Sequence, residues 1–138
     1  MNRDDFETLR GLDDKYIVDD IEFSGSGSTL SFRNISVYNS MNYNILLNGS
    51  YLPRIKKVTY NFVLKDIGPI CRVDVNGTVH RDKGRTHKHE LTKEEDPQNN
   101  LSEATARPDL KEKTPRQVWE LLCNEAKIEH KGKFREPK

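Results

Sequence analysis

The chain has 138 residues, of which 33% are hydrophobic and 33% are charged. This length and composition favour one modest core with a strongly solvated exterior over two independent cores. Lys and Arg outnumber Asp and Glu by only 23 to 22, so any basic surface for nucleic acid must be local. The two cysteines form neither a disulfide framework nor a zinc-finger spacing, and both are predicted to be buried, reduced thiols.

The first residues, MNRDDFETLR, contain no apolar run of the kind that a signal peptide carries. No later stretch is long and apolar enough to cross a bilayer. The sequence therefore predicts a cytoplasmic protein without membrane contact.

The N-terminal half of the chain predicts one helix followed by several strands. Asn2 is suited to cap the helix, Phe6 and Leu9 lie on one of its faces, and Gly11 is suited to end it. The Gly/Ser run at 25–28 predicts a hairpin turn, because it lacks the Lys-Ser/Thr ending of a phosphate-binding loop. Apolar residues that alternate with polar ones predict strands at residues 21–24, 30–37, 43–47, 57–65 and 70–75.

The C-terminal part predicts a loop, a helix and a tail. Residues 93–113 are polar and carry two prolines, so we expect a loop with at most one short helix. A final helix is predicted from Thr114, which with Gln117 has the spacing of a capping box, to a stop at Gly132. The basic tail, residues 131–138, is expected to be frayed.

Together these elements predict an α+β fold in one domain spanning residues 1–138. Short turns between successive strands predict an antiparallel meander, because parallel neighbours would need long crossover connections. We therefore expect a single antiparallel sheet of five or six strands, flanked by the N-terminal and C-terminal helices.

Most of the side chains with catalytic or ligand chemistry lie between residues 72 and 94. Three of the four histidines, His80, His87 and His89, occur there within ten residues. Alternation along a strand places His87 and His89 on one side of their strand, and Arg72 and Asp74 on one side of theirs. The same histidines would also be compatible with an ordinary exposed rim of the sheet.

The leading functional hypothesis is a toxin-like or defence-associated protein that acts on RNA as a metal-independent endoribonuclease. Histidine titrates near neutral pH and can serve as general acid or base, while arginine can hold a phosphate group. No cofactor is then expected. The predicted catalytic residues are His80, His87, His89 and Asp74, and the predicted phosphate-binding residues are Arg72, Arg81, Arg85 and Lys88.

Two alternatives remain open. In one, the protein is a non-enzymatic adaptor or inhibitor from a mobile element or phage that binds a host or phage protein through its Arg and Tyr residues. In the other, it is a metal-binding sheet protein in which His87, His89 and Glu94 hold a divalent transition metal such as zinc. The spacing of these three residues is that of a cupin H-x-H-x(4)-E motif, but the flanking cupin glycines are missing.

A wider pattern covers about residues 20 to 92 and includes residues 44–47 and 58–60. It comprises Arg72-Val73-Asp74, a nearby Gly77 and His80, a turn containing Gly84, and His87-Lys88-His89. The chain here resembles a family of small uncharacterised bacterial and mobile-element proteins with the pattern R-x-D, Gly, His and H-x-H. The resemblance implies no particular activity; it implies that Arg72, Asp74, His80, His87 and His89 belong to one site.

Overall fold

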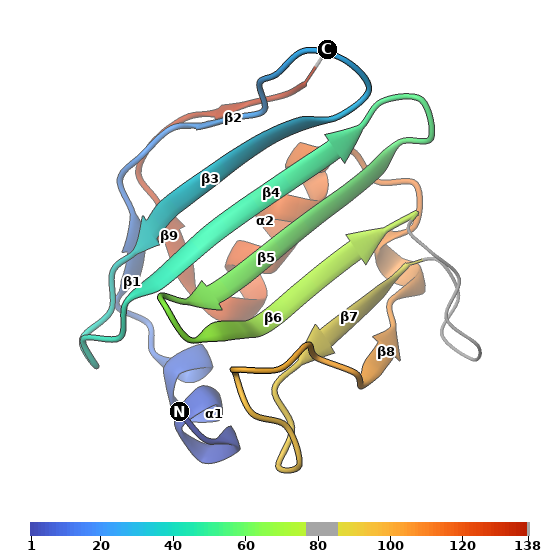
Figure 1. The fold of residues 1–138 in the computed structure, drawn as a ribbon. Helices are drawn as coiled ribbons and strands as arrows, with labels where there is room; N and C mark the ends of the chain where they lie inside the picture. Colours follow the sequence, from blue (N-terminus) through green and yellow to red (C-terminus); the bar gives the residue numbers. More distant parts are fainter. Residues whose placement is uncertain (77–85, 138) are drawn as a thin grey trace.

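The computed structural model of the chain describes residues 1–76 and 86–137 (Figure 1). The described part of the chain begins with a helix and continues with a long run of strands. A second helix and two short strands follow. In chain order they are α1 (Arg3–Gly11), β1 (Lys15–Ile17), β2 (Ile21–Glu22), β3 (Leu30–Val37), β4 (Ile45–Leu52), β5 (Lys57–Leu64), β6 (Gly68–Val75), β7 (His87–Glu90), β8 (Ala104–Ala106), the 3-10 helix η1 (Pro108–Leu110), α2 (Pro115–Ala126), β9 (Ile128–His130) and β10 (Phe134–Arg135).

A six-stranded antiparallel sheet forms the centre of the fold. Its strand order is β3-β4-β5-β6-β7-β8, so every strand pairs with its neighbour in the chain. This confirms the predicted α+β class and the antiparallel meander with helices from both ends of the chain. The Gly/Ser turn is also confirmed, because Ser24 and Ser31 exchange two backbone hydrogen bonds across it.

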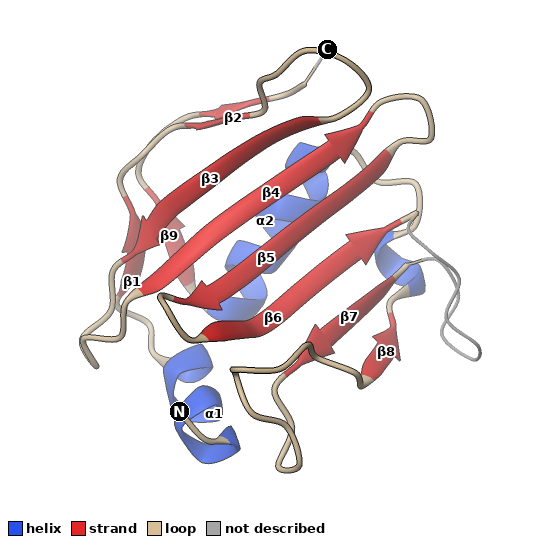
Figure 2. Ribbon diagram, viewed as in Figure 1, coloured by secondary structure: helices blue, strands red, loops and turns tan. Residues whose placement is uncertain are grey.

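The core lies between the sheet and α2, which covers one face of the sheet while the other face stays open to the viewer (Figure 2). Alternate residues of β5 supply this core: Val58, Tyr60, Phe62 and Leu64 are buried, and the residues between them are half-buried. Trp119 of α2 packs against the rings of Tyr60 and Phe62. We call the face toward α2 the inner face of the sheet and the opposite face the outer face.

Both helices begin as the sequence predicts. The side chains of Asn2 and Thr114 accept hydrogen bonds from the third helical residue, and each helix has a complete capping box. Helix α2 ends before the expected Gly132, because Lys127 adopts a left-handed conformation with φ of 54° and starts the turn into β9.

The tail prediction is wrong for the described residues 131–137. Strands β9 and β10 pair in parallel with β1 and β2, forming two small sheets beside the main one. Phe134 is buried because it packs on Phe23 and beneath the Arg116 guanidinium. The predicted loop at 93–113 also needs correction, because residues 104–106 form edge strand β8, whereas the expected short helix is η1.

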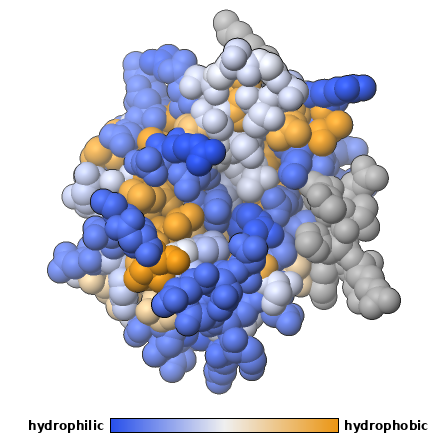
Figure 3. Space-filling view, in the orientation of Figure 1, coloured by the Kyte–Doolittle hydropathy of each residue, from blue (hydrophilic) through white to orange (hydrophobic). Residues whose placement is uncertain are grey.

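The outer face carries mainly polar residues. In the orientation of Figure 1, hydrophilic side chains cover much of the surface, and hydrophobic patches lie between them (Figure 3). Tyr60 points to the inner face, where its hydroxyl donates to the backbone oxygen of Pro115 at 2.6 Å.

Within the described ranges, no helix has the length and apolar character needed to cross a membrane.

Candidate metal centre

Strands β6 and β7 place four of the predicted site residues on the outer face. In their antiparallel register, Asp74 lies opposite His87 and Arg72 lies opposite His89. Directly opposed residues on neighbouring strands project to the same side of a sheet with their Cβ atoms about 5 Å apart. The R-x-D and H-x-H patterns therefore meet because each has a spacing of two and the two strands are adjacent.

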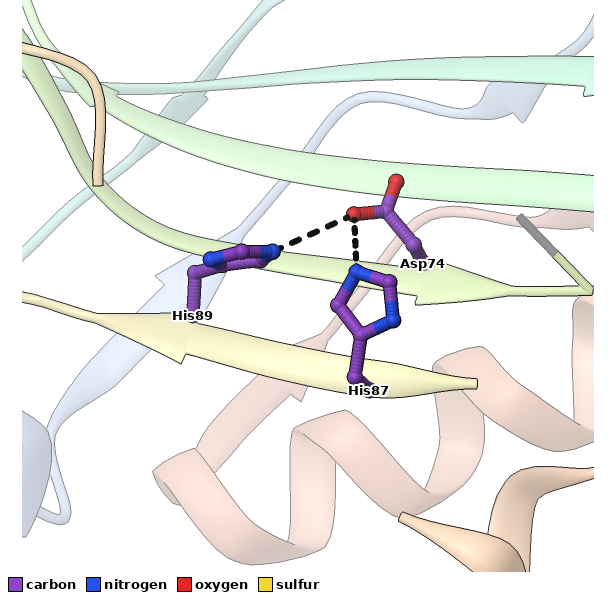
Figure 4. Close-up of side chains that lie close together, drawn as sticks. All are labelled: Asp74, His87 and His89. Atoms are coloured by element: carbon purple, nitrogen blue, oxygen red, sulfur yellow. Dashed lines mark ion pairs between the residues drawn. The ribbon is translucent and has the colours of Figure 1, made fainter. Parts of the chain in front are cut away.

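The side chains of Asp74, His87 and His89 converge on one point (Figure 4). The Nε2 atom of His87 lies 3.3 Å from Asp74 Oδ2, and that of His89 lies 3.8 Å from the same oxygen. The two imidazole rings meet edge to face with centroids 4.8 Å apart. One ligand atom from each of the three residues lies within 4.8 Å of the others.

All three side chains are shielded from solvent. Asp74 is 8% exposed, and His87 and His89 are each 1% exposed. Burial alone would raise the pKa of Asp74. The hydrogen bond from Thr59, the charge and hydrogen bond of Arg72, and the charge that His87 can carry together lower this pKa below its ordinary value. Asp74 is therefore an ionised carboxylate at neutral pH.

Asp74 uses both of its oxygens. Thr59 Oγ1 donates to Oδ1 at 2.8 Å, and Arg72 Nε donates to Oδ2 at 3.0 Å. Thr59 lies directly opposite Asp74 on β5. The carboxylate is thus fixed by Thr59 on the neighbouring strand β5 and by Arg72 on its own strand, with Oδ2 held toward the two imidazoles. Sequence reasoning missed Thr59, because only the strand register brings it to the site.

A second carboxylate, that of Glu95, lies in the segment between β7 and β8. Its Oε1 accepts hydrogen bonds from the backbone nitrogen and hydroxyl of Ser102, and from the backbone nitrogen of Glu103 at 3.2 Å. Its Oε2 is buried and has no hydrogen-bond partner among the described residues. Burial would raise the pKa of Glu95, but the bonds from Ser102 and Glu103 and the charge of His89 lower it. Because the charge of His89 acts on Glu95, this carboxylate lies within electrostatic range of the candidate centre.

Two predicted site residues lie elsewhere. Lys88 projects to the inner face, where its Nζ lies 2.9 Å from Glu90 and 3.9 Å from Glu125, so grouping it with the histidines is wrong. The physical reason is the strand alternation that pairs His87 with His89. Glu94 is exposed and lines an open cleft together with Lys88, so it does not complete a site with the two histidines.

Three further predicted residues, His80, Arg81 and Arg85, lie outside the described residues. Both cysteines are free thiols. Burial raises the pKa of Cys71 and of Cys123 to about 12, which makes either a poor thiolate ligand or nucleophile at neutral pH.

The donor set at Asp74, His87 and His89 fits a divalent transition metal. Bonds of about 2.0–2.2 Å to zinc put neighbouring ligand atoms of a tetrahedral ion roughly 3.4 Å apart. The distances of 3.3 and 3.8 Å from Asp74 Oδ2 to the imidazole nitrogens come close to this value. Two imidazoles and one carboxylate also form a recurring ligand set of zinc and non-haem iron proteins.

No family model, curated protein or solved structure matches this chain. The family resemblance drawn from the sequence therefore stays a prediction, and the functional argument rests on the geometry of the site.

Proposed function

We propose that this protein binds a divalent transition-metal ion, with zinc as the first candidate, through His87 Nε2, His89 Nε2 and Asp74 Oδ2. The observation that carries the proposal is the convergence of these three donors, each buried and each supplied by one of two adjacent strands.

The charges of the site support the same reading. To bind a metal ion, a histidine must be neutral and an aspartate ionised, and Asp74 has the lowered pKa that keeps it ionised. Asp74 is also oriented by Thr59 and Arg72, in the way that outer hydrogen bonds commonly orient metal-binding carboxylates. Imidazole donors favour zinc, copper, iron or nickel over magnesium or calcium.

The metal-independent ribonuclease remains a prediction that the site geometry supports less well. A general acid or base must come within hydrogen-bond reach of the reacting oxygen, and His87 and His89 are each 1% exposed. Tyr60, one of the tyrosines that could have stacked on bases, points into the core instead. Adaptor or inhibitor roles, RNA or protein partners and a cytoplasmic location likewise stay predictions.

Metal titration of the chelator-treated protein tests the proposal. We expect one equivalent of zinc per chain in calorimetry, and an added stability of about 2.7 kcal/mol when free zinc is a hundred times its dissociation constant. Replacing His87→Ala or His89→Ala removes a direct ligand, so each should weaken zinc binding by at least about 100-fold.

His130→Gln is the matched control. Both ring nitrogens of His130 already have partners within the fold: Trp119 Nε1 donates to Nδ1 at 3.1 Å, and Nε2 lies 2.9 Å from the Asp19 carbonyl oxygen. This variant should lose some stability and keep its zinc affinity. Substoichiometric zinc, or equal affinity in the His87 and His130 variants, would rule out the proposed centre. His80→Ala shows in the same assay whether His80 contributes.

A further inference from the structure

Arg72 lies at the solvent side of the candidate metal centre. It is directly opposite His89 on β7 and directly opposite Asn61 on β5. The Arg72 side chain is 26% exposed, compared with 11% for that of Asp74, so the guanidinium links the buried centre with water. Of the guanidinium nitrogens, Nε has a partner, because it donates a hydrogen bond to Asp74 Oδ2. Among the described residues, neither terminal nitrogen of Arg72 takes part in a hydrogen bond or ion pair.

A bound metal would change the charge balance around Arg72. Without metal, the Asp74 carboxylate offsets the guanidinium. A divalent ion on Asp74 and two neutral imidazoles would leave positive charge in excess by two, or by one if Glu95 is counted. Electrostatic interactions are strengthened in a partly buried site, so this excess would attract an anion. A guanidinium presents parallel N–H donors that suit the oxygens of phosphate or carboxylate.

Asn61 adds a second requirement to the ligand. Its Oδ1 is buried and has no hydrogen-bond donor among the described residues. Such an unsatisfied acceptor is uncommon in native proteins and costs about 1–3 kcal/mol. Asn61 and Arg72 are directly opposed, so their Cβ atoms lie about 5 Å apart on the outer face and a ligand beside Arg72 would lie next to the Asn61 side chain. A hydroxyl on that ligand would supply the missing donor.

We propose that Arg72 and Asn61 form a subsite for a hydroxyl-bearing oxyanion of the phosphate class beside the metal centre. The terminal nitrogens of Arg72 donate to two of its oxygens, and its P–OH group donates to Asn61 Oδ1. Inorganic hydrogen phosphate keeps this hydroxyl at neutral and mildly alkaline pH, whereas a phosphate monoester, whose second pKa is about 6, has lost it and should bind through Arg72 alone. The inference rests on the proposed metal function, because the bound ion creates the positive charge that the anion offsets.

Calorimetry of the zinc-loaded protein at about pH 8 tests the subsite with two anions. Phosphate and sulfate are both tetrahedral dianions there, but only phosphate carries a hydroxyl. We expect phosphate to bind at least about tenfold more tightly than sulfate, the effect of one hydrogen bond to a buried acceptor. Titration with a phosphate monoester and with acetate then separates ester from free phosphate and phosphate from carboxylate.

Three variants assign the contacts. Arg72→Gln should lower zinc affinity by about 10–100-fold through the lost bond to Asp74. At zinc concentrations that still saturate this variant with one equivalent, its phosphate binding should be at least about tenfold weaker than in the wild type. Asn61→Leu should abolish the preference for phosphate over sulfate. Arg33→Gln, which removes an exposed arginine of β3, should change neither. Acetate binding as tightly as phosphate would overturn the phosphate assignment.

The outcomes separate the two proposals. Zinc binding without phosphate binding, or phosphate binding that survives Arg72→Gln, would overturn the subsite and leave the metal centre standing. Absence of zinc binding would overturn both. An unchanged phosphate preference in Asn61→Leu would remove Asn61 from the subsite and with it the requirement for a hydroxyl.

Discussion

Asp74 determines what the site can do, because its two oxygens have different partners. Oδ1 accepts from Thr59, while Oδ2 faces Arg72 and both histidines. Replacing a hydrogen-bonded ionised carboxylate with a neutral amide would leave Arg72 without its charge partner, so Asp74 is also a structural residue. Tests of metal binding therefore rely first on the histidines, whose removal leaves the Arg72–Asp74 pair in place.

Glu95 and Glu94 allow a matched comparison, because the two neighbouring carboxylates differ in their contacts. Glu95 binds Ser102 and Glu103 through one oxygen, whereas Glu94 is exposed. Hydrogen bonds to an ionised acceptor are roughly twice as strong as neutral ones. We expect Glu95→Gln to lower the free energy of unfolding by about 1–2 kcal/mol in urea denaturation. Glu94→Gln should change it by less than about 0.5 kcal/mol. Equal stabilities would show that the Glu95 contacts do not hold the loop.

The residue pattern predicted which side chains share a face but not which neighbours they meet. A spacing of two is enough to pair Arg72 with Asp74 and His87 with His89. The same rule places Lys88 on the opposite face, and the sequence interpretation erred by adding it for its charge alone. Thr59 and Asn61 could not be identified, because their contribution depends on the register between β5 and β6, which no local pattern fixes.

At the scale of elements, Glu90 attaches α1 to strand β7. Its carboxylate lies 3.3 Å from Arg3 Nη1, 2.9 Å from Arg10 Nη1 and 2.9 Å from Lys88 Nζ. Burial would raise the pKa of Glu90, but the bond to Lys88 and the charges of Lys88, Arg10 and Arg3 lower it. Helix α1 has nine residues and would be marginal on its own, so these contacts support its position.

The lowered pKa of Glu90 predicts a pH dependence. A carboxyl whose pKa is lower in the folded state stabilises the fold fully above its unfolded pKa of about 4.3, and loses this effect as the pH falls through the folded value. Glu90→Gln should cost about 1.5–3 kcal/mol at pH 7, and the difference from wild type should shrink below about pH 4. Urea unfolding of both proteins across this range measures it.

Glu7→Gln is the control for this prediction. Glu7 pairs with Arg3 within α1, but its side chain is 51% exposed, and such surface pairs contribute little. This variant should change stability by less than about 0.5 kcal/mol at any pH. A cost for Glu90→Gln that stayed constant with pH would mean that the exchange of an acceptor oxygen for a donor NH2 group, and not the charge, explains the loss.

Local signals located the long elements better than the short ones. The helix caps Asn2 and Thr114 and the alternation of β5 come from residues close in the chain, so both helix starts and the bounds of β5 were predicted nearly as observed. The end of α2 was placed too late, at Gly132. Strand β8, Ala104–Ala106, has no β-branched or aromatic run, and it forms because β7 offers an edge to pair with. Strands β1, β9 and β10 have two or three residues each, too few for any periodicity.

For the whole molecule, the two parallel strand pairs join the ends of the chain. Strand β9 pairs with β1, and β10 pairs with β2, so the segment after α2 returns to the segment after α1. Figure 1 shows these blue and red segments side by side at one margin of the sheet. Composition could not reveal this arrangement, since the tail is basic and has one large apolar residue, Phe134.

Deleting the C-terminal tail tests whether the pairing between the two ends of the chain stabilises the fold. Deleting residues 131–138 removes Phe134, which is 9% exposed, from its contact with Phe23. It also removes two backbone bonds of 2.8 Å, one from Lys131 to the Ile17 oxygen and one from Ile21 to the Lys133 oxygen. Because Phe-to-Ala changes in a core cost about 3–5 kcal/mol, we expect a loss of at least about 3 kcal/mol in urea unfolding.

Two further variants make the tail experiment specific. Phe134→Ala in the full chain should account for most of the loss, because burial of the ring contributes more than the exposed charges around it. Deleting residues 137 and 138 alone should leave stability within about 0.5 kcal/mol of the full chain. A frayed tail would give the opposite pattern, with the 131–138 deletion as stable as the full chain. Because small domains have only about 5–15 kcal/mol of stability in total, a loss of 3 kcal/mol is well within the range that urea unfolding resolves.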